Sequence, residues 1–148
     1  MRRLFALIML FYALSSTAQV YNPVKWTTSA VKVSENEYDL VVKAAVEKGW
    51  HLYSQTVPPD GPLPTKFTFD GKGDYLKKGN TKEEEGHIVD DKIFNMKIKY
   101  FESKTIFKQR VQLKNKAAKQ IKSSVEFMAC DDSKCLPPKS VELIFKLK

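Results

Sequence analysis

The only two cysteines of the chain are the residues best suited to chemistry. Four polar residues separate Cys130 from Cys135, and apolar and polar side chains alternate before Cys130 as they do in a β-strand. A second alternating run begins at Val141, after two prolines, so the cysteines lie at the ends of a loop between two predicted strands. Two thiols placed in this way can form a disulfide, which either braces the fold or exchanges with other thiols.

The length of this loop predicts that the two cysteines are direct cross-strand neighbours. Their Cβ atoms would lie about 4.5–5.5 Å apart, slightly more than the ~3.5–4.5 Å of an ordinary disulfide. A bond is feasible with some strain, and strain makes a disulfide easier to reduce. As a brace the bond would be poor, because closing so short a loop contributes roughly 2 kcal/mol, against about 4.7 kcal/mol for a 100-residue loop. Spacing alone leaves an inert and a redox-active disulfide both open.

The charged residues of the loop act on a thiol in opposite directions. Asp131 and Asp132 disfavour a thiolate, whereas Lys134 favours it. No histidine stands beside the cysteines in the sequence, and the pair is not a Cys-x-x-Cys motif. We therefore expect a thiol that is not strongly activated, which suits exchange inside a docked complex.

The remaining candidates for chemistry give no recognised catalytic or metal site. His87 follows the consecutive glutamates 83–85, whose side chains would point in different directions along a strand. Two cysteines and two distant histidines do not form a zinc pattern. No Ser-His-Asp set, paired catalytic carboxylates or glycine-rich phosphate loop stands out, so hydrolase and nucleotide chemistry are not supported. We expect no metal and no cofactor.

The elements that hold the cysteines are predicted to be β-strands. Short alternating segments recur along the chain without long amphipathic runs, which indicates an all-β protein. Residues 55–64 contain four prolines and form an irregular loop, and residues 75–92 are charged and predicted to be loop with one edge strand. We predict an immunoglobulin-like antiparallel β-sandwich of about eight or nine strands. Its main strands are expected at 24–33, 38–46, 50–54, 66–70, 93–101, 105–113, 124–129 and 141–147.

The first residues have the pattern of a secretory signal peptide. Arg2 and Arg3 precede an apolar run at 4–14, and small residues follow at 16–18. We predict a cleaved signal peptide at 1–18, a single domain at 19–148 and no later membrane span. An exported protein with an even number of cysteines is expected to carry them oxidised.

The charge of the chain does not indicate a nucleic-acid partner. The 148 residues are 43% hydrophobic and carry a formal net charge of +8, mostly from lysines spread along the predicted strands. Alternation places these lysines on solvent faces, where they also discourage edge-to-edge pairing of sheets. A nucleic-acid-binding domain more often shows a basic patch or a known motif. We expect a monomer that does not bind nucleic acid.

Three segments resemble one family, the N-terminal domain of the thiol:disulfide interchange protein DsbD. Residues 130–139 read Cys-Asp-Asp-Ser-Lys-Cys-Leu-Pro-Pro-Lys and resemble the active-site hairpin of that family. Residues 49–54, Gly-Trp-His-Leu-Tyr-Ser, resemble one of its strands, and residues 100–104 resemble its aromatic cap loop more weakly. The resemblance covers essentially the whole chain after the signal peptide.

This resemblance implies a thiol:disulfide oxidoreductase of the protein-disulfide reductase type. Such a domain is periplasmic and relays electrons through a reversible Cys130–Cys135 disulfide between thioredoxin-fold partners, one a donor and the other an acceptor. In the family the second cysteine, here Cys135, usually forms the mixed disulfide. The alternative is a non-catalytic sandwich that serves as a binding or scaffold module and keeps a structural disulfide.

The family's cap loop places an aromatic side chain over the disulfide. Tyr100 and Phe101 are the candidates in this chain, with ordinary core or edge aromatics as the alternative. Trp50 and Tyr53 are expected to be structural, with Trp50 in the core. His51 is expected to face the opposite way and to hydrogen-bond a loop.

Overall fold

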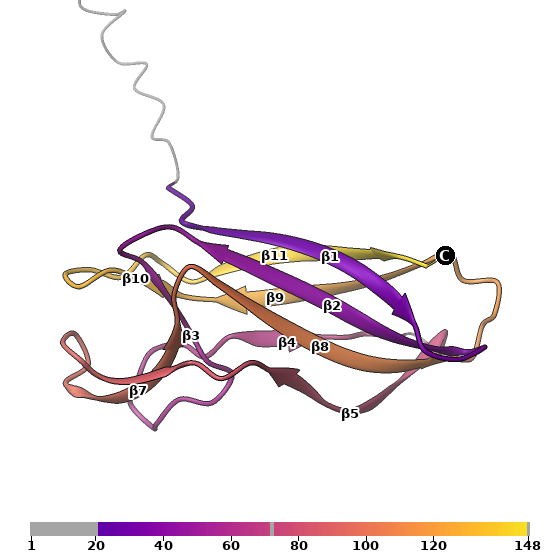
Figure 1. Cartoon of the computed structure of the whole chain (residues 1–148), viewed down its shortest axis with the longest axis horizontal. Coiled ribbons are helices and arrows are strands. Elements are labelled where there is room, and N and C mark those ends of the chain that lie inside the picture. The colour runs from indigo at the N-terminus through magenta and orange to yellow at the C-terminus, as the bar shows by residue number, and fades with distance from the viewer. Residues whose placement is uncertain (1–20, 72, 148) are drawn as a thin grey trace, which may run out of the picture.

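This computed structural model describes residues 21–71 and 73–147 (Figure 1). These residues form β-strands joined by turns and loops, and they contain no helix. The predicted signal peptide lies outside these residues, among which no helix could cross a membrane. The strands are β1 (Val24–Lys32), β2 (Glu37–Val46), β3 (His51–Tyr53), β4 (Lys66–Thr68), β5 (Tyr75–Glu83), β6 (His87–Asp91), β7 (Met96–Phe101), β8 (Lys104–Leu113), β9 (Gln120–Phe127), β10 (Ala129–Cys130) and β11 (Lys139–Lys146).

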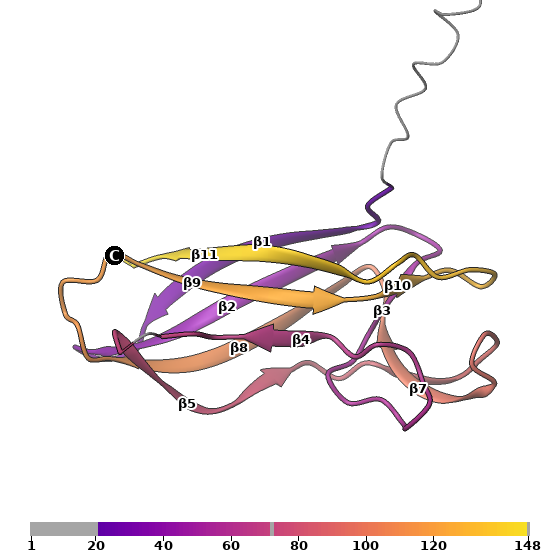
Figure 2. The ribbon, with the colours of Figure 1, turned by 180° about the vertical axis from the view of Figure 1, so that it is seen from behind.

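Two antiparallel sheets form the body of the molecule. One has the order β1-β2-β8-β5, and the other has the order β11-β9-β4 (Figures 1 and 2). The sheets meet along β1 and β11, where the hydroxyl of Thr28 donates a hydrogen bond of 2.5 Å to the carbonyl of Ile144. The prediction of an all-β, immunoglobulin-like sandwich is confirmed.

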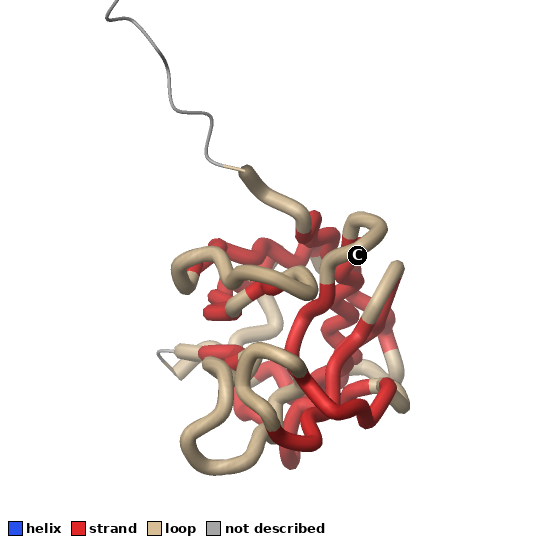
Figure 3. Tube along the Cα trace, turned by 90° about the vertical axis from the view of Figure 1, so that its left-hand side faces the viewer, coloured by secondary structure: helices blue, strands red, loops and turns tan. Residues whose placement is uncertain are grey.

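A third sheet extends one end of this sandwich. Its order is β10-β3-β7-β6, and it lies at the end opposite the C-terminus (Figure 1). Seen from that end, several loops project beyond the strands (Figure 3). The hairpin with the two cysteines belongs to this end, because Cys130 is the last residue of β10.

The main core lies between the two large sheets and follows directly from the alternation in the sequence. Along β9, the side chains of Ile121, Ser123, Val125 and Phe127 are buried while their neighbours face outward. The indole of Trp26 contacts the ring of Phe127, with 5.1 Å between ring centroids. Burying an aromatic or branched apolar side chain contributes about 1.5–3 kcal/mol, so this layer accounts for much of the stability.

Residues 75–101 differ from the prediction in two ways. Two strands, β5 and β6, occupy the segment expected to hold one edge strand. Together with β10, which is separate from β9 although one strand was expected at 124–129, they raise the number of strands in the described residues to eleven. Both β5 and β6 lie at sheet edges and carry mostly exposed side chains, so their sequences do not alternate clearly. The strand expected at 93–101 begins only at Met96, because residues 92–95 form a turn.

Candidate functional site

The two cysteines form a disulfide across the hairpin, as the length of their loop predicted. Cys130 and Cys135 pair as antiparallel neighbours, with a Cα–Cα distance of 4.0 Å. The amide of Leu136 donates to the carbonyl of Ala129 at 2.9 Å and extends the hairpin by one more pair. On its other side, β10 pairs with β3, so that Cys130 lies opposite His51. Of the two cysteines, Cys130 is the one that pairs with the third sheet, next to the pair that Ala129 forms with Leu52.

The side chain of Asp131 holds the loop between the cysteines. Its Oδ1 atom accepts hydrogen bonds of 2.8 Å from the amides of Ser133 and Lys134 and from the hydroxyl of Ser133. The amide of Asp131 also donates to the carbonyl of Lys134 at 2.9 Å. The hydrogen bond from the Ser133 amide is the main cause of the lowered pKa of Asp131. This carboxylate is therefore occupied within its own loop.

A small apolar cluster, which we call the disulfide cluster, surrounds the two sulfur atoms. It is separate from the main core and draws on β3, β7, the loop after β3 and the turn between β6 and β7. Only Tyr53, Ile98 and Cys130 are buried in it. Its partly buried members are Val57, Phe94, Met96, Tyr100, Met128 and Cys135. Cys130 is 0% exposed, whereas Cys135 keeps some contact with solvent.

The turn at 92–95 contributes Phe94 to the disulfide cluster, a residue that the sequence analysis missed. The Oδ1 atom of Asp91 accepts hydrogen bonds of 2.9 and 3.0 Å from the amides of Ile93 and Phe94. Asn95 ends the turn with a positive φ of 53°. Asp and Asn at these positions are typical turn residues and were the available signal. The ring of Phe94 meets that of Tyr53 edge to face, 6.0 Å between centroids.

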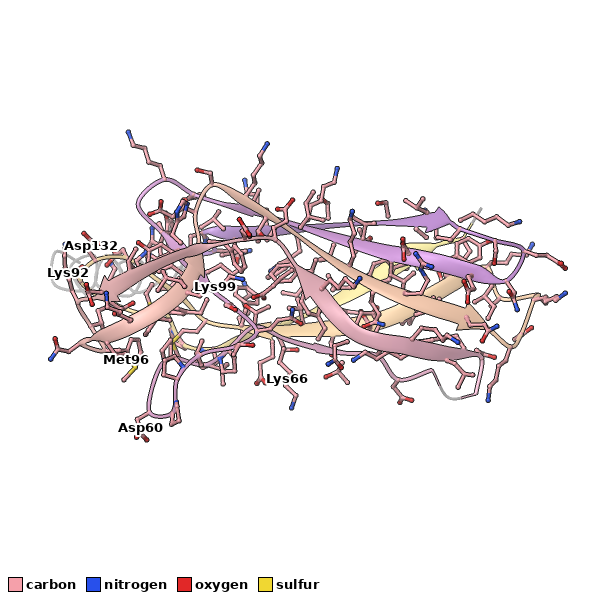
Figure 4. All side chains as sticks on the ribbon, turned by 60° about the horizontal axis from the view of Figure 1, so that its bottom comes forward. Asp60, Lys66, Lys92, Met96, Lys99 and Asp132 are labelled. Carbon is pink, nitrogen blue, oxygen red and sulfur yellow. A yellow bond between two sulfur atoms is a disulfide. The ribbon has the colours of Figure 1, made fainter. Side chains whose placement is uncertain are left out.

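Tyr53 connects this turn to β3. Its hydroxyl donates a hydrogen bond of 2.8 Å to the Oδ2 atom of Asp91, and both residues are buried. Burial and this hydrogen bond raise the pKa of Tyr53 well above its ordinary value. A second link runs over the surface, where the Lys92 ammonium lies 3.0 Å from an Asp132 carboxylate oxygen (Figure 4). The turn is thus bound to β3 inside and to the cysteine loop outside.

The two predicted cap residues lie in different environments. Tyr100 belongs to the disulfide cluster and stacks on the imidazole of His51, with 4.4 Å between centroids. Phe101 is 3% exposed and belongs to the main core, where its ring meets Phe107. Successive residues of a strand point to opposite faces, so only one of the two can reach the cysteines.

The strand at 50–54 behaves partly as expected. Trp50 lies in the main core and contacts the ring of Tyr21 at 5.3 Å. His51 faces the other way, but it is buried against Tyr53 and Tyr100 instead of bonding a loop. Burial lowers the pKa of His51. Within residues 21–71 and 73–147, no group of three or more His, Cys, Asp or Glu side chains could hold a metal ion.

Comparisons with known proteins support the same family as the sequence motifs. The sequence profile described as "Thiol:disulfide interchange protein DsbD, N-terminal" matches residues 21–146. A search of curated proteins gave no match.

Two solved structures are similar in fold. The N-terminal periplasmic domain of ScsB from Proteus mirabilis is 10% identical with a TM-score of 0.57; the match covers 83% of this chain and 45% of that one. The N-terminal domain of Neisseria meningitidis DsbD in the reduced form is 14% identical with a TM-score of 0.54, and the match covers 89% and 94% of the two chains. At these identities the likeness shows the fold alone.

The family match and the bonded cysteine pair together support a thiol–disulfide exchange module. The profile covers the cysteine hairpin, β3 and the turn that carries Phe94. The chain therefore belongs to the family of DsbD N-terminal domains.

Proposed function

We propose that this chain is an exported domain that relays electrons through the Cys130–Cys135 disulfide between thioredoxin-fold proteins. The main support is the surroundings of the bond. It lies in a hairpin at one end of the sandwich, under a small cluster rather than in the main core. A disulfide that only braced the fold would gain more from closing a long loop.

The relay is a pair of thiol–disulfide exchanges. A thiolate of the donor attacks Sγ of Cys135 and forms a mixed disulfide, while Cys130 leaves as a thiolate and takes up a proton. The donor's second thiolate then attacks the donor sulfur of the mixed disulfide and releases Cys135, which is protonated in turn. Two electrons and two protons pass to this domain, and the same steps in reverse reduce an acceptor disulfide.

Unequal exposure supports Cys135 as the sulfur that is attacked. Cys130 is 0% exposed and lies under the disulfide cluster, whereas Cys135 is partly exposed. A thiolate attacks one sulfur of a disulfide along the axis of the S–S bond that breaks, so that sulfur must be accessible from this direction. Phe94 and Tyr100 pack in the same cluster as the two cysteines, so we assign them the shielding role of a cap.

The setting of the relay is an oxidising compartment outside the cytoplasm. The charged and apolar pattern of residues 1–18 supports export, and the similar ScsB domain is periplasmic. There the bond stays oxidised until a partner delivers electrons.

The reduction potential of the Cys130–Cys135 bond tests this function. The purified domain is equilibrated in dithiothreitol redox buffers and its free thiols are counted. A potential between about −270 and −120 mV would place it among exchange proteins, whereas a bond still closed well below about −300 mV would indicate a structural brace.

Trapping with thioredoxin as the probe tests the order of attack. The variant Cys130→Ser keeps the attacked sulfur without its internal partner. It is mixed with a thioredoxin that retains only its attacking cysteine, activated as a mixed disulfide with an aromatic thiol. The Cys135 thiolate displaces the aromatic thiol, so a stable mixed disulfide between the two proteins should accumulate. Cys135→Ser should accumulate far less. Equal trapping by both variants would contradict the assignment of Cys135.

A further inference from the structure

A groove beside the disulfide has a charge opposite to that of the whole chain. It lies between the cysteine loop, the turn at 92–95 and the ends of β3 and β7. Five carboxylates and one ammonium line it, although the chain carries a formal net charge of +8. These charged residues are Asp90, Asp91, Lys92, Glu102, Asp131 and Asp132. A positive protein therefore presents a negative surface next to its reactive bond.

Part of this charge is already used inside the protein. Asp91 accepts hydrogen bonds from the hydroxyl of Tyr53 and from the amides of its turn. Asp131 accepts three hydrogen bonds in the cysteine loop. Asp132 is paired with Lys92. Asp90 has a longer surface contact of 3.6 Å with Lys97, and Glu102 takes part in none of the ion pairs of the described residues. Asp90 and Glu102 thus keep charge available to a ligand.

His51 is an independent indication that this groove takes a ligand. Its side chain lines the groove and the residue is 6% exposed. Its ring contacts Tyr53 and Tyr100. No hydrogen bond joins its ring nitrogens to another of the described residues, and these nitrogens are not among the fully buried polar atoms that lack a partner. A donor that enters the groove would replace water at one of these nitrogens, in a largely buried place where a hydrogen bond is stronger than in bulk water. Burial favours the neutral imidazole, whose free nitrogen accepts a hydrogen bond.

We propose that this groove binds a lysine or arginine side chain that the redox partner carries beside its reactive cysteine. The inference rests on the proposed exchange function and specifies the partner. An ammonium or guanidinium group would meet the carboxylates of Asp90 and Glu102 and donate to His51. Because the groove is lined by the loop between the cysteines, the bound cation would hold the partner's thiolate close to Cys135.

Two small thiols of opposite charge serve as probes of the groove. Cysteamine is cationic and 2-mercaptoethanesulfonate is anionic, and both can reduce the disulfide in two exchange steps. The reduction rate with each is divided by the rate with neutral 2-mercaptoethanol for the same protein. The normalised rate with cysteamine divided by that with 2-mercaptoethanesulfonate is called the cation preference. When the cation preference of a variant is compared with that of the wild type, the intrinsic reactivity of each thiol cancels.

The test variant is Asp90→Asn with Glu102→Gln. Its matched control is Glu126→Gln with Glu142→Gln, on the exposed face of β9 and β11, where Glu142 has a 3.5 Å contact with Lys122. Each variant removes two negative charges, one of them from a surface ion pair. The turn and loop carboxylates Asp91 and Asp131 are left intact because they hold the local backbone.

The cation preference should fall about fivefold in the groove variant at low salt and stay as in the wild type in the control, because opposite charges a few ångströms apart gain about 1 kcal/mol even in water. In about 1 M salt the preference should nearly vanish, since the screening length is then about 3 Å. An equal fall in both variants, or no preference in the wild type, would overturn the groove while leaving exchange intact. A bond that 2-mercaptoethanol cannot open at all would overturn the exchange function, and the groove with it.

Discussion

The main core and the disulfide cluster are both built from aromatic and apolar side chains, but they differ in how completely these are buried. In the main core, Phe107, Phe145 and Leu40 are each 0% exposed. In the disulfide cluster most members, including Phe94 and Tyr100, remain partly exposed. The first region can hold the fold together, and the second can open locally at small cost.

The two regions also differ in the origin of their side chains. The main core comes from long strands that alternate over eight to ten residues, such as β2, β8 and β9. The disulfide cluster comes from strands of two to six residues, from the loop after β3 and from a turn. The comparison teaches that stability and reactivity are assigned to separate parts of this sandwich, and four changes test it.

The largest expected effect is that of Phe107→Ala in the main core. This ring contacts Trp26, Phe67 and Phe101, and truncating a buried phenylalanine costs about 3–5 kcal/mol. Urea unfolding should report this loss, whereas the reduction rate of the disulfide in the folded protein should not change. A clear acceleration of reduction under native conditions would show that the two regions are coupled.

The next effect is that of removing the disulfide with Cys130→Ala and Cys135→Ala. The bond closes a short loop, so its loss should lower the free energy of unfolding by about 2 kcal/mol and abolish all exchange. The sandwich should stay folded, as measured by circular dichroism and urea unfolding. Loss of the folded state would mean that the disulfide braces the main core as well.

A smaller change in stability is expected for Phe94→Ala, together with faster chemistry. The ring is only partly buried, so its removal should cost about 1 kcal/mol and make open states of the turn about fivefold more populated. Reduction by dithiothreitol should speed up by a similar factor. Phe69→Ala is the matched control, because this ring is also partly buried but packs on the main core. Equal acceleration in both variants would remove the shielding role of Phe94.

The smallest effect is a dependence of stability on pH that comes from His51. Its pKa is lowered by burial, although Asp91, Asp132, Glu102 and Asp131 act in the opposite direction. The unfolded chain therefore binds a proton before the folded one, and the free energy of unfolding should decrease as the pH falls below the ordinary value of 6.5.

His51→Phe should remove this decrease, and His87→Gln should retain it, with urea unfolding measured between pH 7 and 4.5. Four carboxylates have lowered pKa values: Glu35 and Glu83, with an ordinary value of 4.5, and Asp39 and Asp131, with an ordinary value of 3.8. Their contribution to stability is lost as the pH falls towards and below these values. Because both variants keep all four carboxylates, the difference between the variants reports His51. An unchanged pH dependence in His51→Phe would contradict a buried neutral imidazole.

Much of the fold was predictable because it depends on local patterns. Strict alternation predicted the buried faces of β2, β8 and β9, and the loop between Cys130 and Cys135 predicted their cross-strand pairing. The edge strands β5 and β6 were missed because solvent on most sides removes the alternation that identifies a strand.

The environment of the disulfide was much less predictable. Ile93 and Phe94 are apolar and precede β7, so they were assigned to that strand, whereas Asp91 and Asn95 place them in a turn. The resemblance of residues 100–104 to the family's cap loop indicates both Tyr100 and Phe101, and only the two faces of β7 distinguish them. The sequence patterns at 91–95 and 100–101 span only a few residues, whereas the contacts that place Phe94, Tyr100 and Phe101 join segments far apart along the chain.

The sequence by itself determined the β-sandwich, its main core and which two cysteines can bond, because these follow from periodicity and from spacing over a few residues. Only the tertiary structure decided what covers the sulfur atoms, which cysteine reaches solvent and where carboxylates gather. The residues responsible come from β3, the turn at 92–95, β7 and the cysteine loop, segments far apart along the chain. Their proximity is a result of packing, which no local pattern records.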